Sequence, residues 1–459
     1  MDALPADAAR WSLPRRLAFR FVFVYLLLYS LPWPLGWIPG TGVVAQWYES
    51  GSDALLAWFG HSVLGVTADL APFPTGSGDT TRAYVALVLQ PVLAVLVTLS
   101  WSAFDRRAAH PRLADLLRTW LRYVLASAML GYGCAKFFGG QFPALDVSRL
   151  QATWGECSPM GVVWRFMGAS QAYTAFSGVV ECFGGLLLLW RRTATLGALV
   201  SAGAMTNVVL INFCYDVPVK LYSSHLLLMA VAIAWRDLPR LAALFVWNRA
   251  VPAAALRLPA PRWAFWTARV AKVAVVGFLL FGNGMGVVGR ASAPAETGPI
   301  DGHYDVVALQ RDGQDVPTPA AEARAWRRFS CRYGQVTLER HGSKEREYYR
   351  VQIDAAAQTA TLQRLLPPDA DVPPDLVLKW RDPAAPPAAA QPVEAAATAA
   401  ANAVPANASA KAPKPGRVLE LEGEEDGHRF VVRLHEPPLA SFPLYSRGFH
   451  WIQEYPYHR

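Results

Sequence analysis

Apolar runs of transmembrane length alternate with short polar segments over the first 290 residues of the chain. Each run holds about 20 residues, the length that a helix needs to cross roughly 30 Å of hydrocarbon. We therefore predict an all-α polytopic membrane helix bundle with about seven transmembrane helices. The predicted spans are Leu17–Ile38, Ala83–Phe104, Trp120–Phe138, Tyr173–Trp190, Thr195–Phe213, Leu221–Leu241 and Val270–Val288.

After Arg290 the apolar residues recur at every second position, the pattern that predicts β-strands. About eight short strands, several separated by Asp-Gly or His-Gly turns, favour a small antiparallel barrel or sandwich. The Ala/Pro-rich segment 382–416 cannot bury a core, so we expect a disordered loop there. The predicted strands are Gly302–Arg311, Arg327–Tyr333, Gln335–His341, Tyr348–Asp354, Thr359–Leu366, Leu376–Arg381, Val418–Glu422 and Phe430–His435.

Three domains follow from this change of pattern: an N-terminal segment (1–16), a transmembrane bundle (17–289) and a β domain (290–459). Within the bundle, residues 41–81 are too polar to span and include an amphipathic stretch, which predicts a helix lying on the outer surface. Residues 139–172 are also too polar to span, and we expect them to fold over the mouth of the bundle.

Composition supports a membrane protein, since 53% of the residues are hydrophobic and only 17% are charged. The net charge of +8 comes from Arg residues in short loops between the apolar runs rather than from a basic stripe along one helix. We therefore expect the lipid bilayer, and not nucleic acid, as the partner of the helical region.

The distribution of Lys and Arg predicts the orientation of the chain in the membrane. Basic residues gather in the N-terminal segment and in alternate loops, as at Arg106–Arg118 and Arg191–Arg192, whereas the intervening loops are acidic. The N-terminus is thus expected to be cytoplasmic, and seven crossings place the β domain outside. The Ala-, Arg-, Pro- and Gly-rich composition is typical of a bacterium, so we predict the inner membrane with a periplasmic β domain.

The five cysteines do not form a disulfide scaffold, and neither a CxxC motif nor a Cys/His metal-binding spacing occurs. We interpret Cys134, Cys157, Cys182, Cys214 and Cys331 mainly as small packing residues. A bridge between Cys134 and Cys157 on the oxidising side remains an alternative.

Several polar side chains interrupt the predicted spans near one membrane face, where an ionisable group costs several kcal/mol unless it is paired or reaches water. Glu181 lies eight residues into its span, and Gly178, Gly184 and Gly185 beside it permit a close helix contact. We predict an outer-leaflet site with catalytic Glu181, His225 and Lys136, and with ligand-binding Asn207, Asn212, Asp216, Lys220, Asp79 and Glu156.

The alternative interpretation is structural, in which Glu181 is satisfied by Lys136, Lys220 or an Asn and locks two helices together. Asp79 has a second interpretation as well, because Asp79 or Thr80 can cap the helix that follows. The neighbouring Gly76 and Gly78 also permit an anion-binding loop.

The residues from 118 to 240 resemble the DoxX family. The resemblance rests on Gly131–Phe137, ending in Ala-Lys-Phe, followed by Glu181-Cys-Phe-Gly-Gly and the basic turn Arg191-Arg192-Thr193. Further segments resemble a group of larger bacterial DoxX-like proteins: Thr75–Thr81, Ser158–Gly161, Asn212–Tyr222 and Arg447–Trp451. A more distant resemblance is to the membrane half of vitamin K-dependent carboxylase.

The resemblance implies a quinone or another isoprenoid-like lipid as the ligand, although the chain lacks a flavin, haem or iron–sulfur motif. Two functions of different class remain. In the first, the bundle is a quinone-linked oxidoreductase component or lipid-modifying enzyme, with Glu181 or His225 exchanging protons. In the second, it is a non-catalytic membrane scaffold whose outer β domain binds a protein or lipid partner.

Overall fold

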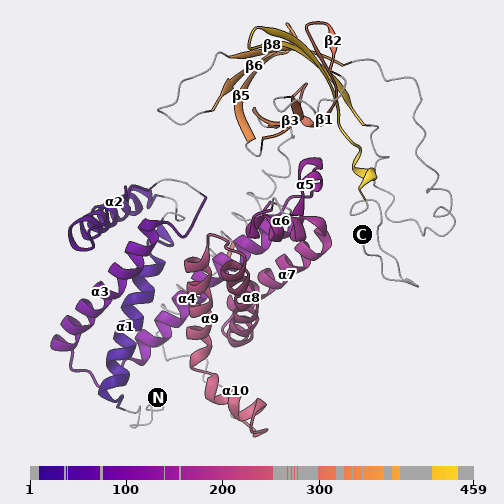
Figure 1. The fold of residues 1–459 in the computed structure, drawn as a ribbon. Helices are drawn as coiled ribbons and strands as arrows, with labels where there is room; N and C mark the ends of the chain where they lie inside the picture. Colours follow the sequence, from indigo (N-terminus) through magenta and orange to yellow (C-terminus); the bar gives the residue numbers. More distant parts are fainter. Residues whose placement is uncertain are drawn as a thin grey trace, which may run out of the picture. The chain divides into compact units, whose positions relative to one another are not determined.

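The computed structural model describes residues 10–251 and 298–442 apart from several gaps, together with residues 266, 270, 273, 276 and 277. The gaps are 36–37, 39, 73–75, 139, 155–156, 317–324, 333, 344–345, 366–374 and 383–415. The chain divides into two compact units, Met1–Ala144 with Cys157–Ala293 and Leu145–Glu156 with Pro294–Arg459. The first unit is helical and the second is a β-barrel that carries one short helix (Figure 1).

Nine α-helices are described in the helical unit, and α2 continues into a short π-helical turn, η2. Together with α5 of the barrel unit, they make ten described α-helices. The elements of the helical unit are α1 (Leu13–Ser30), α2 (Gly42–Trp58), η2 (Phe59–Val63), α3 (Thr81–Phe104), α4 (Pro111–Phe137), α6 (Pro159–Ala169), α7 (Gln171–Leu188), α8 (Ala194–Cys214), α9 (Lys220–Trp235) and α10 (Leu238–Phe245).

Two described helices, α3 and α8, are long and apolar enough to cross a membrane, and α9 is a shorter apolar helix. Their outer faces carry exposed large apolar side chains such as Leu96, Leu99 and Phe213. Exposed apolar surface on this scale is costly in water. These helices support a membrane association of the helical unit.

The helix ends differ from the predicted spans at several places. Helix α4 begins at Pro111 rather than at Trp120, and two further differences have local causes. Helix α1 begins earlier, at Leu13, and ends at Ser30, because Pro32 and Pro34 cannot continue a helix. The predicted span Leu221–Leu241 is divided into α9 and α10, with Asp237 between them. The predicted span Val270–Val288 lies almost entirely outside the described residues.

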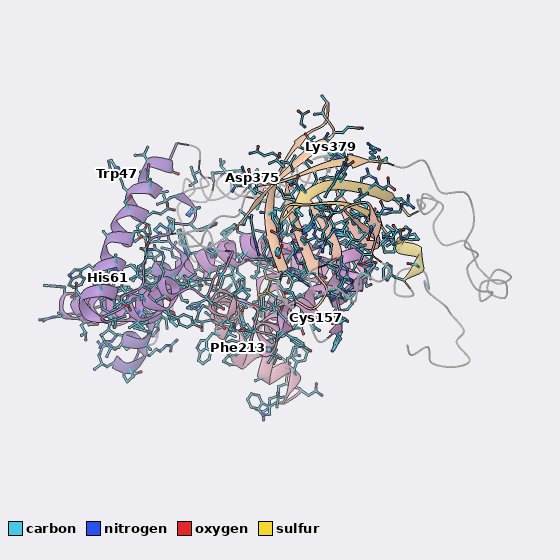
Figure 2. The ribbon with its side chains drawn as sticks, turned by 45° about the horizontal axis from the view of Figure 1, so that its top comes forward. Trp47, His61, Cys157, Phe213, Asp375 and Lys379 are labelled. Atoms are coloured by element: carbon cyan, nitrogen blue, oxygen red, sulfur yellow. The ribbon has the colours of Figure 1, made fainter. Side chains whose placement is uncertain are left out.

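The amphipathic stretch predicted within residues 41–81 is confirmed as a helix, α2. Its inner side and η2 contribute Leu56 and Phe59 to a small core with Leu70, Val85 and Leu89. The opposite side is open, and Trp47 is 74% exposed there (Figure 2).

The β unit is a closed antiparallel barrel. Of the two folds predicted from the sequence, a barrel or a sandwich, the barrel is confirmed. Eight strands pair in sequence order, and β1 pairs with both β3 and β9, so the sheet has no open edge. The two-residue β2 only extends the β1 hairpin. The strands are β1 (Gly302–Arg311), β2 (Gln314–Asp315), β3 (Trp326–Arg332), β4 (Gln335–Arg340), β5 (Arg346–Asp354), β6 (Thr359–Arg364), β7 (Leu376–Arg381), β8 (Val418–Glu425) and β9 (His428–His435).

The predicted strands are confirmed to within a few residues, and two Asp-Gly turns are confirmed as well. Asp312-Gly313 and Asp426-Gly427 have positive φ at both residues, as a tight hairpin turn requires. The predicted loop 382–416 lies outside the described residues except at its ends.

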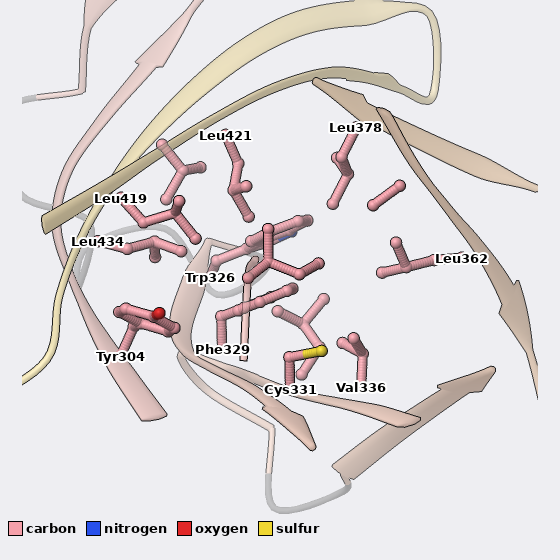
Figure 3. Close-up of a cluster of buried hydrophobic side chains, with 14 of the residues drawn as sticks. Tyr304, Trp326, Phe329, Cys331, Val336, Leu362, Leu378, Leu419, Leu421 and Leu434 are labelled. Atoms are coloured by element: carbon pink, nitrogen blue, oxygen red, sulfur yellow. The ribbon is translucent and has the colours of Figure 1, made fainter. Parts of the chain in front are cut away.

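Alternation along the strands fills the barrel with apolar side chains (Figure 3). In β7, Leu376, Leu378 and Trp380 point inward while the residues between them are exposed. Lys379 lies on the outside of the barrel (Figure 2). Tyr304, Phe329 and Cys331 reach the same interior, and burial raises the pKa of the Cys331 thiol. The barrel is therefore packed with its own side chains.

Helix α5 (Val147–Gln151), which comes from the segment predicted to fold over the mouth of the bundle, packs on the barrel. Asp146, just before α5, accepts a hydrogen bond of 2.5 Å from Arg332 Nη1 and lies 3.9 Å from His303 Nε2. Gln151 at the end of α5 donates to Asp305 on β1. Leu145–Glu156, a part of the segment between α4 and α6, thus belongs to the barrel unit.

One charged network ties distant strands of the barrel together. Arg340 on β4 donates to Glu347 on β5, with Nε 3.0 Å from Oε1, and also to Glu425 on β8. Tyr349 donates to Glu347 Oε2 at 2.7 Å. Burial opposes ionisation of Glu347, but the hydrogen bonds from Arg340 and Tyr349 outweigh it and hold the pKa of this carboxyl below its ordinary value.

This network predicts acid sensitivity of the barrel. Because the pKa of Glu347 is lower in the folded state, its stabilisation is complete above about pH 4.3, the ordinary Glu pKa, and is lost as the pH falls through the folded value. Glu347→Gln should lower the stability of β4 and β5 by about 1–3 kcal/mol at pH 7. The further loss of stability on acidification should then be smaller in this variant than in the parent protein. Hydrogen exchange of the full-length protein, corrected for the intrinsic rate, measures both effects.

The matched control is Glu420→Gln, which removes an ion pair with Arg433 on the outer surface. That variant should change the stability by less than about 1 kcal/mol. An equal effect of the two substitutions would contradict a special role for the Arg340 network.

Candidate functional site

A buried ion pair joins α4 to α7. Lys136 Nζ lies 2.6 Å from Glu181 Oε1 and 2.7 Å from Oε2, and both side chains are less than a tenth exposed. Lys136 Nζ also lies 5.8 Å from the centre of the Tyr132 ring. Of the partners considered for Glu181, the structure selects Lys136.

Glycines allow α4 and α7 to touch along their backbones at this ion pair. A Cβ atom added to Gly133 would lie 2.6 Å from the carbonyl oxygen of Gly178, and one added to Gly178 would lie 2.5 Å from that of Gly133. A Cβ atom at Gly185 would lie 3.1 Å from Met129 on α4, and one at Gly184 would lie 2.7 Å from Ser201 on α8. The predicted role of the α7 glycines in close helix packing is confirmed.

His225 on α9 lies in an aromatic environment built mainly by α1. Its ring stacks on Tyr29, with the ring centres 3.7 Å apart and nearly parallel. Nδ1 lies 2.7 Å from the carbonyl oxygen of Leu221, and Nε2 lies 2.6 Å from the Tyr25 hydroxyl. Because a carbonyl only accepts, Nδ1 carries a proton; in the neutral ring, Nε2 then accepts from Tyr25.

Asp79 caps α9 rather than the helix that directly follows it. Its carboxylate accepts hydrogen bonds from the backbone N–H groups of Lys220 (2.8 Å) and Leu221 (3.0 Å). The negative charge at the N-terminus of α9 also interacts favourably with the dipole of that helix. Thr80 caps α3 by accepting from the Ala83 N–H. The Lys220 side chain donates to Asp216 at 2.7 Å.

The remaining predicted ligand residues fall in different places. Asn212 is buried and donates to Ser223 Oγ at 2.9 Å and to the Val219 carbonyl oxygen, so it joins α8 to α9. Asn207 is exposed. Glu156 lies outside the described residues.

Two cavities in the helical unit share three tyrosines, and one of the two reaches His225. The first has a volume of about 430 Å³ and the second about 410 Å³. Tyr29, Tyr132 and Tyr222 line both cavities, and His225 lines the first. Segment 76–78 and α3 complete the first cavity, and α4 and α9 complete the second.

The sequence did not single out these tyrosines, since an aromatic residue in an apolar span resembles ordinary core packing. One signal was present, because Tyr25 and Tyr29 are four residues apart and therefore lie on one helix face. Tyr132 and Tyr222 come from helices distant in sequence, so only the fold shows that they line the same volume as Tyr29.

The lining suits a flat, mostly apolar ligand with a few hydrogen-bonding groups. Tyrosine rings supply planar apolar surface, and their hydroxyls supply donors. Cavities of this volume are within the range of small-molecule sites, about 300–1,000 Å³. Among the residues that the structure describes, no group of three or more His, Cys, Asp or Glu side chains is placed to hold a metal ion.

The buried ion pair predicts a large effect of Glu181→Gln. The substitution keeps the shape but leaves Lys136 charged and unpaired, so it should destabilise the helical unit by roughly 3–5 kcal/mol. Adding Lys136→Met should restore much of the loss. Denaturant unfolding of the purified full-length protein measures both variants.

Asp216→Asn is the control, because it also removes a carboxylate bonded to a lysine, but at a side chain 81% exposed. Asn also tolerates the positive φ of this position. This variant should stay within about 1 kcal/mol of the parent. If Glu181→Gln changed the stability as little as Asp216→Asn, the Lys136–Glu181 ion pair would not contribute significantly to holding α4 and α7 together.

Comparison with known proteins gives one informative similarity. The chain is 36% identical over 116 residues to YwoB, an uncharacterised protein of Bacillus subtilis (strain 168). The aligned part is 25% of this chain and 73% of YwoB. No family model and no solved structure matches the chain. The resemblance to DoxX therefore stays a prediction. Because YwoB is uncharacterised, the similarity to it indicates no activity for this chain.

Proposed function

We propose that this chain, which belongs to the same protein family as YwoB, is an integral membrane protein whose helical unit binds a quinone or another isoprenoid lipid. The observation that carries the proposal is the pair of cavities that share Tyr29, Tyr132 and Tyr222, the first of which is also lined by His225. The proposed role is redox-linked, as the DoxX resemblance implies.

The chemistry of a quinone headgroup fits this lining. A quinone ring is flat and apolar and carries two carbonyl oxygens that accept hydrogen bonds. Aromatic faces pack against such a ring, and tyrosine hydroxyls donate to the carbonyls. The second cavity is lined largely by apolar side chains of α4 and α9, which suits an isoprenoid tail.

The proposed proton exchange is assigned to His225 and Tyr25. These two groups share a hydrogen bond of 2.6 Å, so a proton can pass between them. Neither Lys136 nor Glu181 lines either of the two cavities. We therefore assign them to positioning Tyr132, whose ring lies 5.8 Å from the Lys136 ammonium.

The proposed location is a bacterial inner membrane, with the N-terminus in the cytoplasm and the barrel in the periplasm. The apolar helices α3 and α8 and the Arg-rich loops support this arrangement. The barrel is packed with its own side chains, so its proposed contribution is an outer surface for a protein or lipid partner.

Filling the first cavity should remove the ligand. Ala86 on α3 lines this cavity, and Ala86→Phe places a ring in the space. We expect at least a roughly tenfold loss of quinone per mole of purified protein, the equivalent of about 1.4 kcal/mol. Solvent extraction followed by liquid chromatography and mass spectrometry measures the lipid. Ala103→Phe, at an exposed position of the same helix, is the matched control.

The wild-type protein also decides the question directly. If no quinone or other isoprenoid lipid copurified, or if both Phe variants retained it equally, the proposed ligand or its position would be wrong. Unchanged folding of the Ala86→Phe variant is checked by its thermal unfolding.

The topology has its own test. A reporter that is active only in the cytoplasm should work when fused after Arg249 and stay silent when fused after Arg459. The predicted span Val270–Val288 lies between these two fusion points and places them on opposite sides of the membrane. Activity at both positions would eliminate the seven-span arrangement.

A further inference from the structure

Two cysteines meet at the crossing of α4 and α7, where the backbones of these helices touch. Cys134 Sγ lies 3.9 Å from Cys182 Sγ, and Cys182 Sγ lies 4.0 Å from the Leu130 carbonyl oxygen. The two residues are 48 positions apart in the chain, so the fold alone brings them together. Both are free thiols.

The surrounding contacts bring the two helices within reach of a disulfide. A Cβ atom added to Gly133 would lie 2.5 Å from Cys182 Sγ and 2.8 Å from the Cys182 backbone nitrogen. An S–S bond is about 2.05 Å long, so the sulfurs, now 3.9 Å apart, must approach by about 1.9 Å when the bond forms. Both side chains are half-buried rather than fully enclosed.

We propose that Cys134 and Cys182 form a redox-active dithiol that reduces an external disulfide and becomes a disulfide itself. One thiolate attacks a sulfur of the external disulfide, breaks its S–S bond and releases one thiol. The second thiolate then attacks the mixed disulfide, forms the Cys134–Cys182 bond and releases the second thiol. Two electrons and two protons pass to the external disulfide, so no further oxidant is needed.

The position of the pair gives this reaction a structural consequence. Cys182 directly follows Glu181, and Cys134 lies two residues before Lys136. The disulfide would therefore fix α4 to α7 beside the buried ion pair. This inference is independent of the quinone, because the thiol contact lies at the helix crossing and neither cysteine lines either of the two cavities.

The test equilibrates the full-length protein in detergent with buffers of reduced and oxidised dithiothreitol, followed by acid quenching and alkylation. We expect the number of alkylated thiols to fall from five to three as the buffer becomes oxidising, with a linked peptide that joins Cys134 to Cys182. Returning the protein to reduced dithiothreitol should restore all five.

Single cysteine variants distinguish a specific Cys134–Cys182 disulfide from random oxidation of the cysteines. Cys134→Ala and Cys182→Ala should each abolish the linked peptide, whereas Cys157→Ala should retain it. Five alkylated thiols in every buffer would overturn the proposal, as would linked peptides that join Cys157 or Cys214 equally often. The mapping on the wild-type protein stands even if an Ala variant does not fold.

Discussion

Helices α4 and α7 meet backbone to backbone because Gly133 and Gly178 have no Cβ atoms, and this contact brings the charged groups of Lys136 and Glu181 together. At such a short separation the Lys136 ammonium reaches both oxygens of Glu181. The buried charges compensate one another, so neither has to reach water. A larger residue at either glycine would separate the helices and with them the two charges.

The second constraint is the start of α9, which positions the wall of the cavities. Asp79 holds the N–H groups of Lys220 and Leu221, and Asn212 joins α8 to the same turn. His225 follows within the next helical turn and stacks on Tyr29 of α1. The cap therefore determines where the aromatic rings lie, and a change in the 76–79 segment would act on the cavities through α9.

The barrel achieves its stability by closure and by alternation. Pairing of β1 with β9 removes the open edges that an isolated sheet would present. Each strand sends every second side chain inward, so a chain of modest size still encloses a continuous apolar core. The segment with Asp146 and α5, which lies between α4 and α6 in the sequence, belongs to this unit and adds the hydrogen bond from Arg332 to Asp146.

The sequence determined the helical and β regions, nearly all the strands and their tight turns, because periodicity and Asp-Gly turn chemistry are local properties of the chain. It also identified Glu181 and the glycines beside it, since a charge in an apolar span is conspicuous. Only the tertiary structure decided that Lys136 is the partner of Glu181, that Asp79 caps α9, and that tyrosines from separate helices surround one volume. These contacts join residues far apart in sequence, and their distances depend on how helices pack, which no local pattern specifies.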